Sequence, residues 1–420
     1  MGNQRELLRD LFDGAVQAAL PKHTIKKYLP DPPKGRTIVV GCGKAAATMA
    51  QAVEKCWEYP LEGIVVTRYG HSVPTGRIKV VEASHPVPDA AGMQAALKIQ
   101  ALVSNLTAED LVIFLVSGGG SSLLTLPAKG ITLDDKKVLN TKLLHSGANI
   151  REMNCVRKHL SSIKGGRLAE SIWPAHCVTL AISDIPGDDL SVIASGPTEP
   201  DETTYKDASA ILRKYHINEP KSIIEFLNSD NPETPKPGNQ IFNNIQSHLI
   251  STPQRSLEAA AEIARERGFT PLILGDAIEG EAREVARVLA GITKQVIRHE
   301  QPIRRPCVLL TGGETTVTVN GKGRGGRNAE FLLSLAIELN GLAGVWAFAG
   351  DTDGIDGTED NAGALITPDS LERAREIGLD AKQMLADNDG YNFFSKLNDL
   401  VITGPTLTNV NDFRAIVIDQ

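Results

Sequence analysis

The sequence has no excess of basic residues and no long hydrophobic run. Its 44 lysines and arginines are outnumbered by 51 aspartates and glutamates, giving a formal net charge of −7 at pH 7. We therefore do not expect nucleic acid as a main partner, because no surplus of positive charge is present to neutralise phosphates. No apolar stretch approaches the roughly 20 residues of a membrane-spanning helix. The charged, amphipathic N-terminal segment also lacks the apolar core of a signal peptide, so we expect no membrane partner.

Paired cysteine motifs and a Walker A sequence are also missing. The five cysteines are scattered, with no C-x-x-C, so they are interpreted as reduced core thiols of a cytoplasmic protein. Gly43-Lys44 is followed by alanine, where a P-loop needs serine or threonine. There is no internal repeat and no low-complexity tract.

The order of apolar and amphipathic runs predicts two α/β domains. A chain of 420 residues is too long for one ordinary core. Between residues 37 and 182, continuous apolar strands alternate with helix-length segments, which favours a doubly wound, mostly parallel sheet covered on both faces. The Pro- and Asn-rich stretch at 229–239 predicts a linker, and a second α/β series follows it. We expect domains at 1–240 and 241–420.

The most distinctive segment is 311–330, TGGETTVTVNGKGRGGRNAE. It follows an apolar strand and leads directly into an apolar helix. Glycines allow close approach of the backbone, and amides at a helix N-terminus favour anions. Lys322, Arg324 and Arg327 add positive charge beside those amides. The segment therefore predicts a site for a phosphorylated or carboxylated ligand.

Two further glycine-rich loops follow predicted strands. The loop at 41–46, GCGKAA, fits the dinucleotide pattern G-x-G-x-x-A and places Lys44 beside Gly43. The next strand ends in Thr67-Arg68, with no acidic residue for a ribose hydroxyl. This weakens an NAD interpretation but leaves NADP open; Lys44 would also suit a phosphate or carboxylate, and a plain tight turn is the simpler alternative.

The second loop combines glycines with hydroxyl groups, which suits a nest of backbone amides around an anion. A serine nucleophile is less favoured, since the G-x-S-x-G pattern is not matched, and a flexible turn is the simpler alternative. The residues of this loop are Ser117, Gly118, Gly119, Gly120, Ser121 and Ser122.

Acidic residues follow two other predicted strands. Asp184, Asp188 and Asp189 lie within six residues, and Mg²⁺ often takes only one or two carboxylates. One of them could instead orient an attacking hydroxyl. The loop at 350–357 contains Asp353, which with Glu314 could form a second carboxylate pair around a metal. Acidic surface turns are the simpler alternative at both places.

A basic segment at 157–167 lies in a predicted helical region. Most charges of this kind lie on a solvated face. The Gly165-Gly166 pair within it nevertheless hints at close approach of the backbone to a ligand.

In sequence order, these loops resemble the class II glycerate kinases, the glycerate 2-kinases with a C-terminal MOFRL domain. The resemblance covers nearly the whole chain. Two local departures, Pro186 and Leu407 (where glycine is common), touch no charged position. The matching blocks are GCGKAA (41–46), SGGGSSLL (117–124), NCVRKHLSSIKGGRLA (154–169), SDIPGDDLSVIASGPT (183–198), TGGETTVTVNGKGRGGRNAEF (311–331), AGDTDGIDG (349–357) and TGPTLTNVND (403–412).

The resemblance implies phosphorylation of D-glycerate at its 2-hydroxyl, with ATP and Mg²⁺ as cofactors. It also implies a larger Rossmann-like N-terminal domain and a smaller α/β MOFRL domain, with the active site in the cleft between them. It leaves open whether the protein is a monomer or a homodimer. The positions that match the family's functional residues are Lys44, Asp189, Glu314, Arg327, Asp353 and Asn409.

The resulting hypothesis places the ATP phosphates against the 117–122 amides. Mg²⁺ would be held by acidic residues among Asp184, Asp188, Asp189 and Asp353, while Lys44 and Arg327 neutralise charge on the transferred group. Asp189 would orient the attacking hydroxyl. Two rivals are an NAD(P)H-dependent hydroxypyruvate reductase, a label that relatives often carry, and a non-catalytic anion-binding module.

Overall fold

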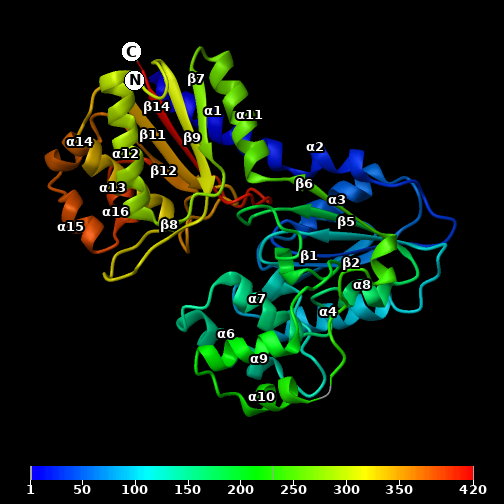
Figure 1. The fold of residues 1–420 in the computed structure, drawn as a ribbon. Helices are drawn as coiled ribbons and strands as arrows, with labels where there is room; N and C mark the ends of the chain where they lie inside the picture. The colour runs from blue at the N-terminus through cyan, green and yellow to red at the C-terminus, as the bar shows by residue number, and fades with distance from the viewer. Residues whose placement is uncertain (1, 230, 420) are drawn as a thin grey trace. The chain divides into compact units, whose positions relative to one another are not determined.

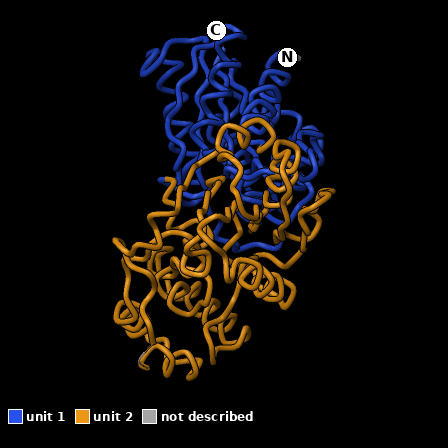
Figure 2. The backbone as a smooth tube through the Cα atoms, turned by 90° about the vertical axis from the view of Figure 1, so that its right-hand side faces the viewer, with its two compact units in different colours: residues 1–20, 184–187, 251–420 blue, residues 21–183, 188–250 orange. Residues whose placement is uncertain are grey.

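The computed structural model describes residues 2–229 and 231–419 (Figure 1). Its chain forms two compact units (Figure 2). Unit 2 contains residues 21–183 and 188–250, and unit 1 contains residues 1–20, 184–187 and 251–420. Each unit is built around its own six-stranded sheet.

The sheet of unit 2 has the strand order β3-β2-β1-β4-β5-β6, which is the order of the Rossmann fold. The four pairings from β3 to β5 are parallel. β1 and β4 are buried along their whole length, as expected for central strands covered on both faces. The predicted doubly wound sheet is therefore confirmed. The strands are β1 (Thr37–Cys42), β2 (Glu62–Arg68), β3 (Ile78–Ala83), β4 (Leu111–Val116), β5 (His176–Ile182) and β6 (Ile245–Ser251).

Helices α3 (Ala46–Cys56) and α4 (Ala90–Leu102) pack on this sheet. Four other helices gather together and share a separate apolar core (Figure 1). Three of these four begin with capping boxes, in which a Thr or Asn side chain and an acidic residue three positions later satisfy free amides. The four are α6 (Leu133–His145), α7 (Ile150–His159), α9 (Tyr205–Lys214) and α10 (Lys221–Asn228). Shorter helices are α2 (Pro21–Thr24), η1 (Ile25–Tyr28), α5 (Gly120–Leu123), α8 (Arg167–Ile172), η2 (Ile193–Ser195) and η3 (Gln240–Asn244).

The sheet of unit 1 has the order β13-β12-β11-β14-β9-β7. Only its β7–β9 pair is parallel, and the remaining pairs are antiparallel. The predicted second α/β domain is confirmed, and its sheet is mixed. The strands are β7 (Thr270–Gly275), β9 (Cys307–Gly313), β11 (Val345–Asp351), β12 (Gly363–Ile366), β13 (Leu400–Val401) and β14 (Asp412–Ile418), with a small pair β8 (Gly280–Glu281) and β10 (Thr315–Thr316).

Alternate residues of these strands face two different helical layers, as the strand period of two requires. Val308 and Leu310 belong to the core with α1 and α11, whereas Cys307 and Leu309 belong to the core with α12 and α13. The helices are α1 (Gly2–Ala19), α11 (Pro253–Glu266), α12 (Ala282–His299), α13 (Arg327–Leu339), α14 (Ser370–Glu376), α15 (Ala381–Ala386) and α16 (Gly390–Lys396).

The units differ from the expected division at residue 240 at three places, of which the shortest is residues 184–187 in unit 1. The first 20 residues belong to unit 1, because α1 buries its apolar face against α11 and the sheet. The ring centroids of Phe12 and Phe348 are 4.7 Å apart. Residues 241–250 belong to unit 2, where β6 extends the parallel sheet.

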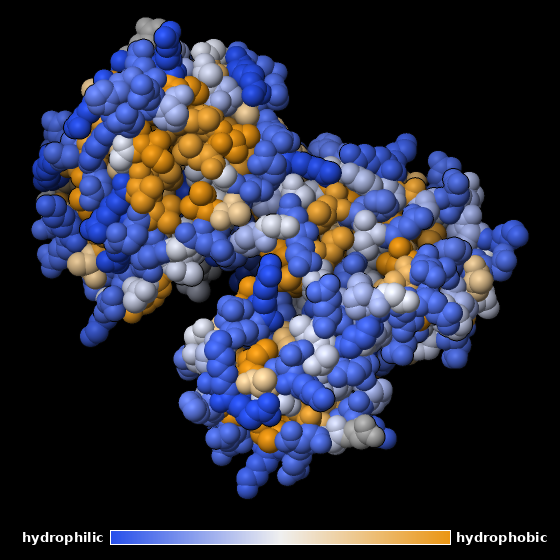
Figure 3. Space-filling view, in the orientation of Figure 1, coloured by the Kyte–Doolittle hydropathy of each residue, from blue (hydrophilic) through white to orange (hydrophobic). Residues whose placement is uncertain are grey.

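Within the described residues, no helix combines the length and apolarity needed to cross a membrane. Exposed large hydrophobic residues occur in both units, for example Leu144 in unit 2 and Val319 in unit 1. On the face drawn in Figure 3, apolar patches are interrupted by hydrophilic residues. All five cysteines are free thiols, and four of them are buried.

Candidate functional site

The turn after β1 uses its own amides within unit 2. The amide of Gly43 donates to the Val66 carbonyl (3.1 Å), and the amide of Lys44 donates to the Gly118 carbonyl (2.8 Å). The amide of Ala45 donates to Ser117 Oγ (3.0 Å). A dinucleotide pyrophosphate would need such amides free at this turn. The G-x-G-x-x-A pattern therefore marks a tight packing of β1 against the β4 loop here and gives no support to NAD(P).

The loop after β4, in contrast, has amides that are not used in hydrogen bonds within the protein. In the part of the chain that the structure describes, the amides of Gly118, Gly119 and Ser121 have no hydrogen-bond partner. Gly119 has a φ of +79°, and a Cβ on it would lie 2.9 Å from His85 Cδ2 and 3.4 Å from Lys44 Cγ. This loop therefore offers amides to an anion close to Lys44.

The close approach at Gly119 can be tested against a matched glycine. Gly130 has a similar φ of +91°, but nothing lies within 4 Å of the position of its Cβ. We expect Gly130→Ala to lower the free energy of unfolding by about 1–2 kcal/mol through the backbone alone. Gly119→Ala should cost about 1–3 kcal/mol more because its methyl group overlaps His85. Equal losses in chemical denaturation would contradict the close approach.

Ser121 is not placed as a nucleophile. Its Oγ lies 3.0 Å from Ser195 Oγ, which in turn donates to Asn154 Oδ1 (3.2 Å). This chain of hydroxyl groups contains no histidine or carboxylate base. Ala194, Ser195 and Gly196 all have positive φ values, of 51°, 63° and 59°. Such consecutive left-handed residues are strained and are held by their surroundings.

The acidic loop after β5 is divided between the units. Asp184, in unit 1, accepts a hydrogen bond from Asn409 Nδ2 (3.0 Å). Asp188 and Asp189 are in unit 2. Asp189 is exposed, and its Oδ1 accepts from the Ser191 amide (2.9 Å). Asp188 Oδ1 is buried, with no hydrogen-bond partner among the described residues.

The expected metal ligands Asp184, Asp188 and Asp353 do not form a preformed cage. No group of three or more His, Cys, Asp or Glu residues is arranged to hold a metal ion within residues 2–229 and 231–419. The buried Oδ1 of Asp188 is the atom that suits a cation, because a buried acceptor without a partner is costly. Mg²⁺ commonly binds one or two carboxylates together with substrate phosphates, and Asp188 fits that mode.

The expectation of a solvated basic face at 157–167 is wrong for several of its members. Lys158 is buried and pairs with Asp201 (3.4 Å), and Lys164 is 1% exposed. The glycine pair serves packing, because a Cβ on Gly166 would lie 2.9 Å from the ring of Phe242. Lys158 and Lys164 are therefore buried because α7 and the loop after it pack closely against the rest of unit 2.

In unit 1, the antiparallel register gathers carboxylates at one end of the sheet. Asp351 ends β11 and pairs with Asp412, which begins β14, and Asp412 pairs with Gly313 at the end of β9. Glu314 follows directly. Sequence reasoning did not single out Asp351 and Asp412 as site residues, because only the strand register brings them together.

Arg327 binds all three of these carboxylates. Its Nε donates to Asp412 (2.8 Å), its Nη1 to Glu314 (2.8 Å) and its Nη2 to Asp351 (2.7 Å). Burial alone would lower the pKa of Arg327, but the three carboxylates raise it above its usual value. A guanidinium has five N–H groups, so these contacts leave two of them for a ligand. Because three carboxylates compensate its charge, Arg327 would bind a ligand mainly through the directed hydrogen bonds of its two remaining N–H groups.

The start of α13 is fixed by Asp356. Its carboxylate accepts from the amides of Asn328 (3.0 Å) and Ala329 (2.9 Å), as expected at a helix N-terminus. Burial raises the pKa of Asp356 to about 6. A Cβ on Gly326 would lie 2.3 Å from Asp356 Oδ1. These contacts position Arg327, the first residue of α13.

Asp353 and Asn409 are buried in the loops beside this cluster. Asp353 Oδ1 accepts from the Ile355 amide (2.9 Å), and its own amide donates to Asp351 Oδ1 (2.9 Å). Asn409 Oδ1 accepts from the Asn411 amide (3.3 Å), and its Nδ2 binds Asp184. Both side chains therefore stabilise the loops that carry Asp184 and Asp351.

Two family descriptions match the chain, and similar proteins span its whole length. Residues 7–228 match "Domain of unknown function (DUF4147)" and residues 307–412 match the "MOFRL family". A "Putative hydroxypyruvate reductase" of Agrobacterium vitis is 56% identical over 99% of this chain and 94% of its own length. A "D-glycerate 2-kinase" of Thermotoga maritima is 42% identical over 97% of both chains.

The solved structure of a similar protein supports the same family. The crystal structure of a glycerate kinase from Thermotoga maritima superposes with a TM-score of 0.91, at 41% identity, and covers 100% of both chains. Fold, domain order and sequence thus agree across the full chain, so the protein belongs to the glycerate 2-kinase family with a MOFRL domain.

Proposed function

We propose that this protein transfers the γ-phosphoryl group of ATP to the 2-hydroxyl of D-glycerate, giving 2-phosphoglycerate and ADP. Relatives named glycerate 2-kinase at 42% and 40% identity support the activity. The observation that carries it is the contrast between two neighbouring loops. The 43–45 amides are engaged within the protein, whereas those of Gly118, Gly119 and Ser121 are available beside Lys44. We further propose a cytoplasmic location, in line with the five free thiols.

Unit 2 is proposed to bind the phosphates of ATP. The amides of Gly118, Gly119 and Ser121 would donate hydrogen bonds to phosphate oxygens, and Lys44 would neutralise charge as it develops on the transferred group. Asp188 would hold Mg²⁺ through its buried Oδ1. Mg²⁺ bound to the nucleotide would reduce the negative charge of its phosphate oxygens. The exposed carboxylate of Asp189 is proposed to orient the 2-hydroxyl.

Unit 1 is proposed to supply Arg327 and the residues that position it. The planar fork of arginine suits a carboxylate or a phosphate, and two N–H groups of Arg327 remain for such a ligand. Asp351 and Asp412 fix the orientation of the guanidinium. Glu314, whose side chain is 48% exposed, is the member of the cluster that a substrate hydroxyl can reach from solvent.

The second candidate, an NAD(P)H-dependent hydroxypyruvate reductase, takes its support from the names of the Agrobacterium vitis relatives. Two observations disfavour it. The amides of the turn after β1 are engaged within the protein. β2 ends in Arg68, with no acidic residue to bind the ribose hydroxyl of NAD, so this second observation disfavours NADH alone and the first bears on both nucleotides.

The test is to incubate the full chain with ATP, Mg²⁺ and D-glycerate and identify the product by phosphorus NMR. We expect 2-phosphoglycerate, with no loss of NADH or NADPH absorbance when hydroxypyruvate is supplied. Formation of 3-phosphoglycerate would overturn the regiochemistry. Absence of any phosphoglycerate, with oxidation of the reduced nucleotide, would establish the reductase instead.

A further inference from the structure

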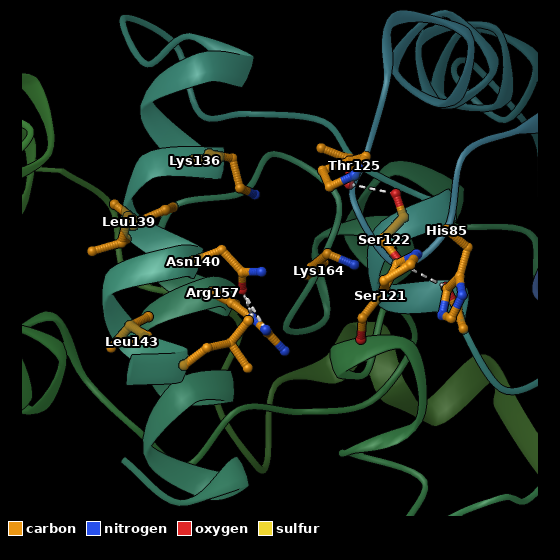
Figure 4. A pocket seen from close by; sticks show the side chains of 15 residues that line it. His85, Ser121, Ser122, Thr125, Lys136, Leu139, Asn140, Leu143, Arg157 and Lys164 are labelled. Atoms are coloured by element: carbon orange, nitrogen blue, oxygen red, sulfur yellow. Dashed lines mark hydrogen bonds between the residues drawn. The ribbon is translucent and has the colours of Figure 1, made fainter. Parts of the chain in front are cut away.

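Unit 2 contains a cavity between the helices α6 and α7 and the loop that follows β4 (Figure 4). Its volume is about 240 Å³, far above the roughly 10–15 Å³ that one water requires. Side chains of Lys136, Arg157 and Lys164 extend into it from one side, and Ser121 and Ser122 lie across from them. The cavity therefore has room and polar groups for a ligand.

The three cations of this cavity have no acidic counterpart. No carboxylate lines the cavity, and none is paired with Lys136, Arg157 or Lys164 among the described residues. Lys164 Nζ donates to the Ala194 carbonyl (3.0 Å), and Arg157 binds the Asn140 side chain. Burial lowers the pKa of Lys164 to about 8, and burial and the other two cations lower that of Lys136. An anion bound among these three basic groups would offset their mutual repulsion and favour their protonated forms.

The same cavity has an extensive apolar wall. Lys136, Leu139, Asn140 and Leu143 follow the helical spacing i, i+3, i+4, i+7 on α6, so one face of this helix carries both the cation and the leucines. Leu160 continues the wall after α7. Leu144 also lines the cavity and is 60% exposed. The ligand that fits is an anion with a flat apolar portion.

We propose that this cavity binds the nucleotide: the phosphates contact Lys136, Arg157 and Lys164, and the base packs on the leucine wall of α6. The inference rests on the proposed kinase function, which requires a nucleoside triphosphate. D-glycerate matches the cavity less well, because it has a carboxylate and hydroxyls but no apolar part. Phosphates that also contact the neighbouring 117–122 loop would lie near Lys44, because Lys44 Cγ lies 3.4 Å from the position of a Cβ on Gly119.

Calorimetric titration of the full chain with the non-hydrolysable analogue AMP-PNP and Mg²⁺ tests the proposal without turnover. We expect Lys136→Ala and Leu144→Asp each to weaken AMP-PNP binding at least about tenfold, since one loses a charge-assisted contact and the other places a carboxylate beside the base and phosphates. The KM for D-glycerate should change less than about twofold, which is below 0.5 kcal/mol. Circular dichroism confirms that each variant is folded.

Two neighbouring positions on α6 supply matched controls. Lys137, which pairs with Asp134 (3.6 Å), and Val138, 45% exposed, do not line the cavity. Lys137→Ala and Val138→Asp should therefore bind AMP-PNP like the unaltered protein. Unchanged nucleotide affinity in Lys136→Ala and Leu144→Asp, a rise in the KM for D-glycerate alone, or no AMP-PNP binding by the unaltered protein would each overturn the proposal. If AMP-PNP binds at this cavity but no phosphoglycerate forms from ATP and D-glycerate, the kinase function would be overturned and the nucleotide site would be supported.

Discussion

Arg327→Ala is expected to lower kcat for phosphoryl transfer by about 10²–10³-fold, the usual cost of removing one preorganised group that stabilises the transition state. Arg327 holds Glu314, Asp351 and Asp412 at once. The substitution therefore removes the two N–H groups left for the ligand and also leaves the carboxylates without their shared partner. Steady-state kinetics with both substrates varied would measure the loss and separate kcat from KM.

The same substitution should leave unit 1 folded. Asp412 retains hydrogen bonds from Arg414 (2.6 Å) and Asn328 (2.8 Å). Breaking a buried ion pair usually costs about 3–5 kcal/mol. Because the Arg327 side chain is 21% exposed, we expect the free energy of unfolding to fall by at most about 3 kcal/mol. Thermal melting measured beside the kinetics would show that the loss of kcat belongs to folded protein.

The variants Arg324→Ala and Arg327→Lys provide the controls. Arg324 belongs to the same loop, its side chain is 57% exposed, and it pairs with Glu359. Arg324→Ala should leave kcat within about twofold, since exposed ion pairs contribute little. Arg327→Lys keeps the charge but lacks the planar fork, so it should recover stability more than kcat. A folded Arg327→Ala variant with full turnover would remove Arg327 from the mechanism.

Much of the fold was accessible from the sequence. The strands of unit 2 are continuous apolar runs, so β1, β4 and β5 lie where the pattern predicts them. The placement of α1 in unit 1 was not accessible, because an amphipathic helix does not reveal which surface covers its apolar face. The mixed strand directions in the sheet of unit 1 were also not predicted, since strand direction depends on connections between distant segments.

The candidate site was accessible only in part. Glu314 and Arg327 were singled out by their glycine-rich segment, and the structure brings them together. Asp412 lies 85 residues from Arg327 and has no local pattern, so only the strand register identifies it. Lys136 resembles an ordinary lysine of an amphipathic helix. Its signal was the shared spacing with Leu139 and Leu143, which on its own also describes a packed helix face.

At one position where this chain departs from the family pattern, the backbone shows why glycine is common. Leu407 has a φ of +66°, in the left-handed region that favours glycine. The strain falls on the loop that carries Asn409 and leaves the hydrogen bond between Asn409 and Asp184 intact.

Lys44→Met should lower kcat by a factor of similar size to that expected for Arg327→Ala. Methionine keeps an unbranched stem next to Gly119 and removes only the ammonium group. The backbone contacts of Lys44, from its amide to Gly118 and from Thr67 Oγ1 to its carbonyl (3.2 Å), do not depend on the side chain. We therefore expect kcat to fall by about 10²–10³-fold, and thermal melting measured beside the kinetics would show that the loss belongs to folded protein.

Lys55, in the last turn of α3, gives the matched control. It is exposed, and its Nζ donates to Gln51 on the same helix (3.1 Å). Lys55→Met should turn over like the unaltered protein. If Lys44 acts on the transferred phosphoryl group, AMP-PNP affinity should fall much less than kcat, because that charge develops in the transition state. Equal losses of kcat and AMP-PNP affinity would instead make Lys44 a ground-state phosphate ligand. The charge neutralisation in phosphoryl transfer would then rest on the metal bound to the nucleotide, with Arg327 supplying directed hydrogen bonds.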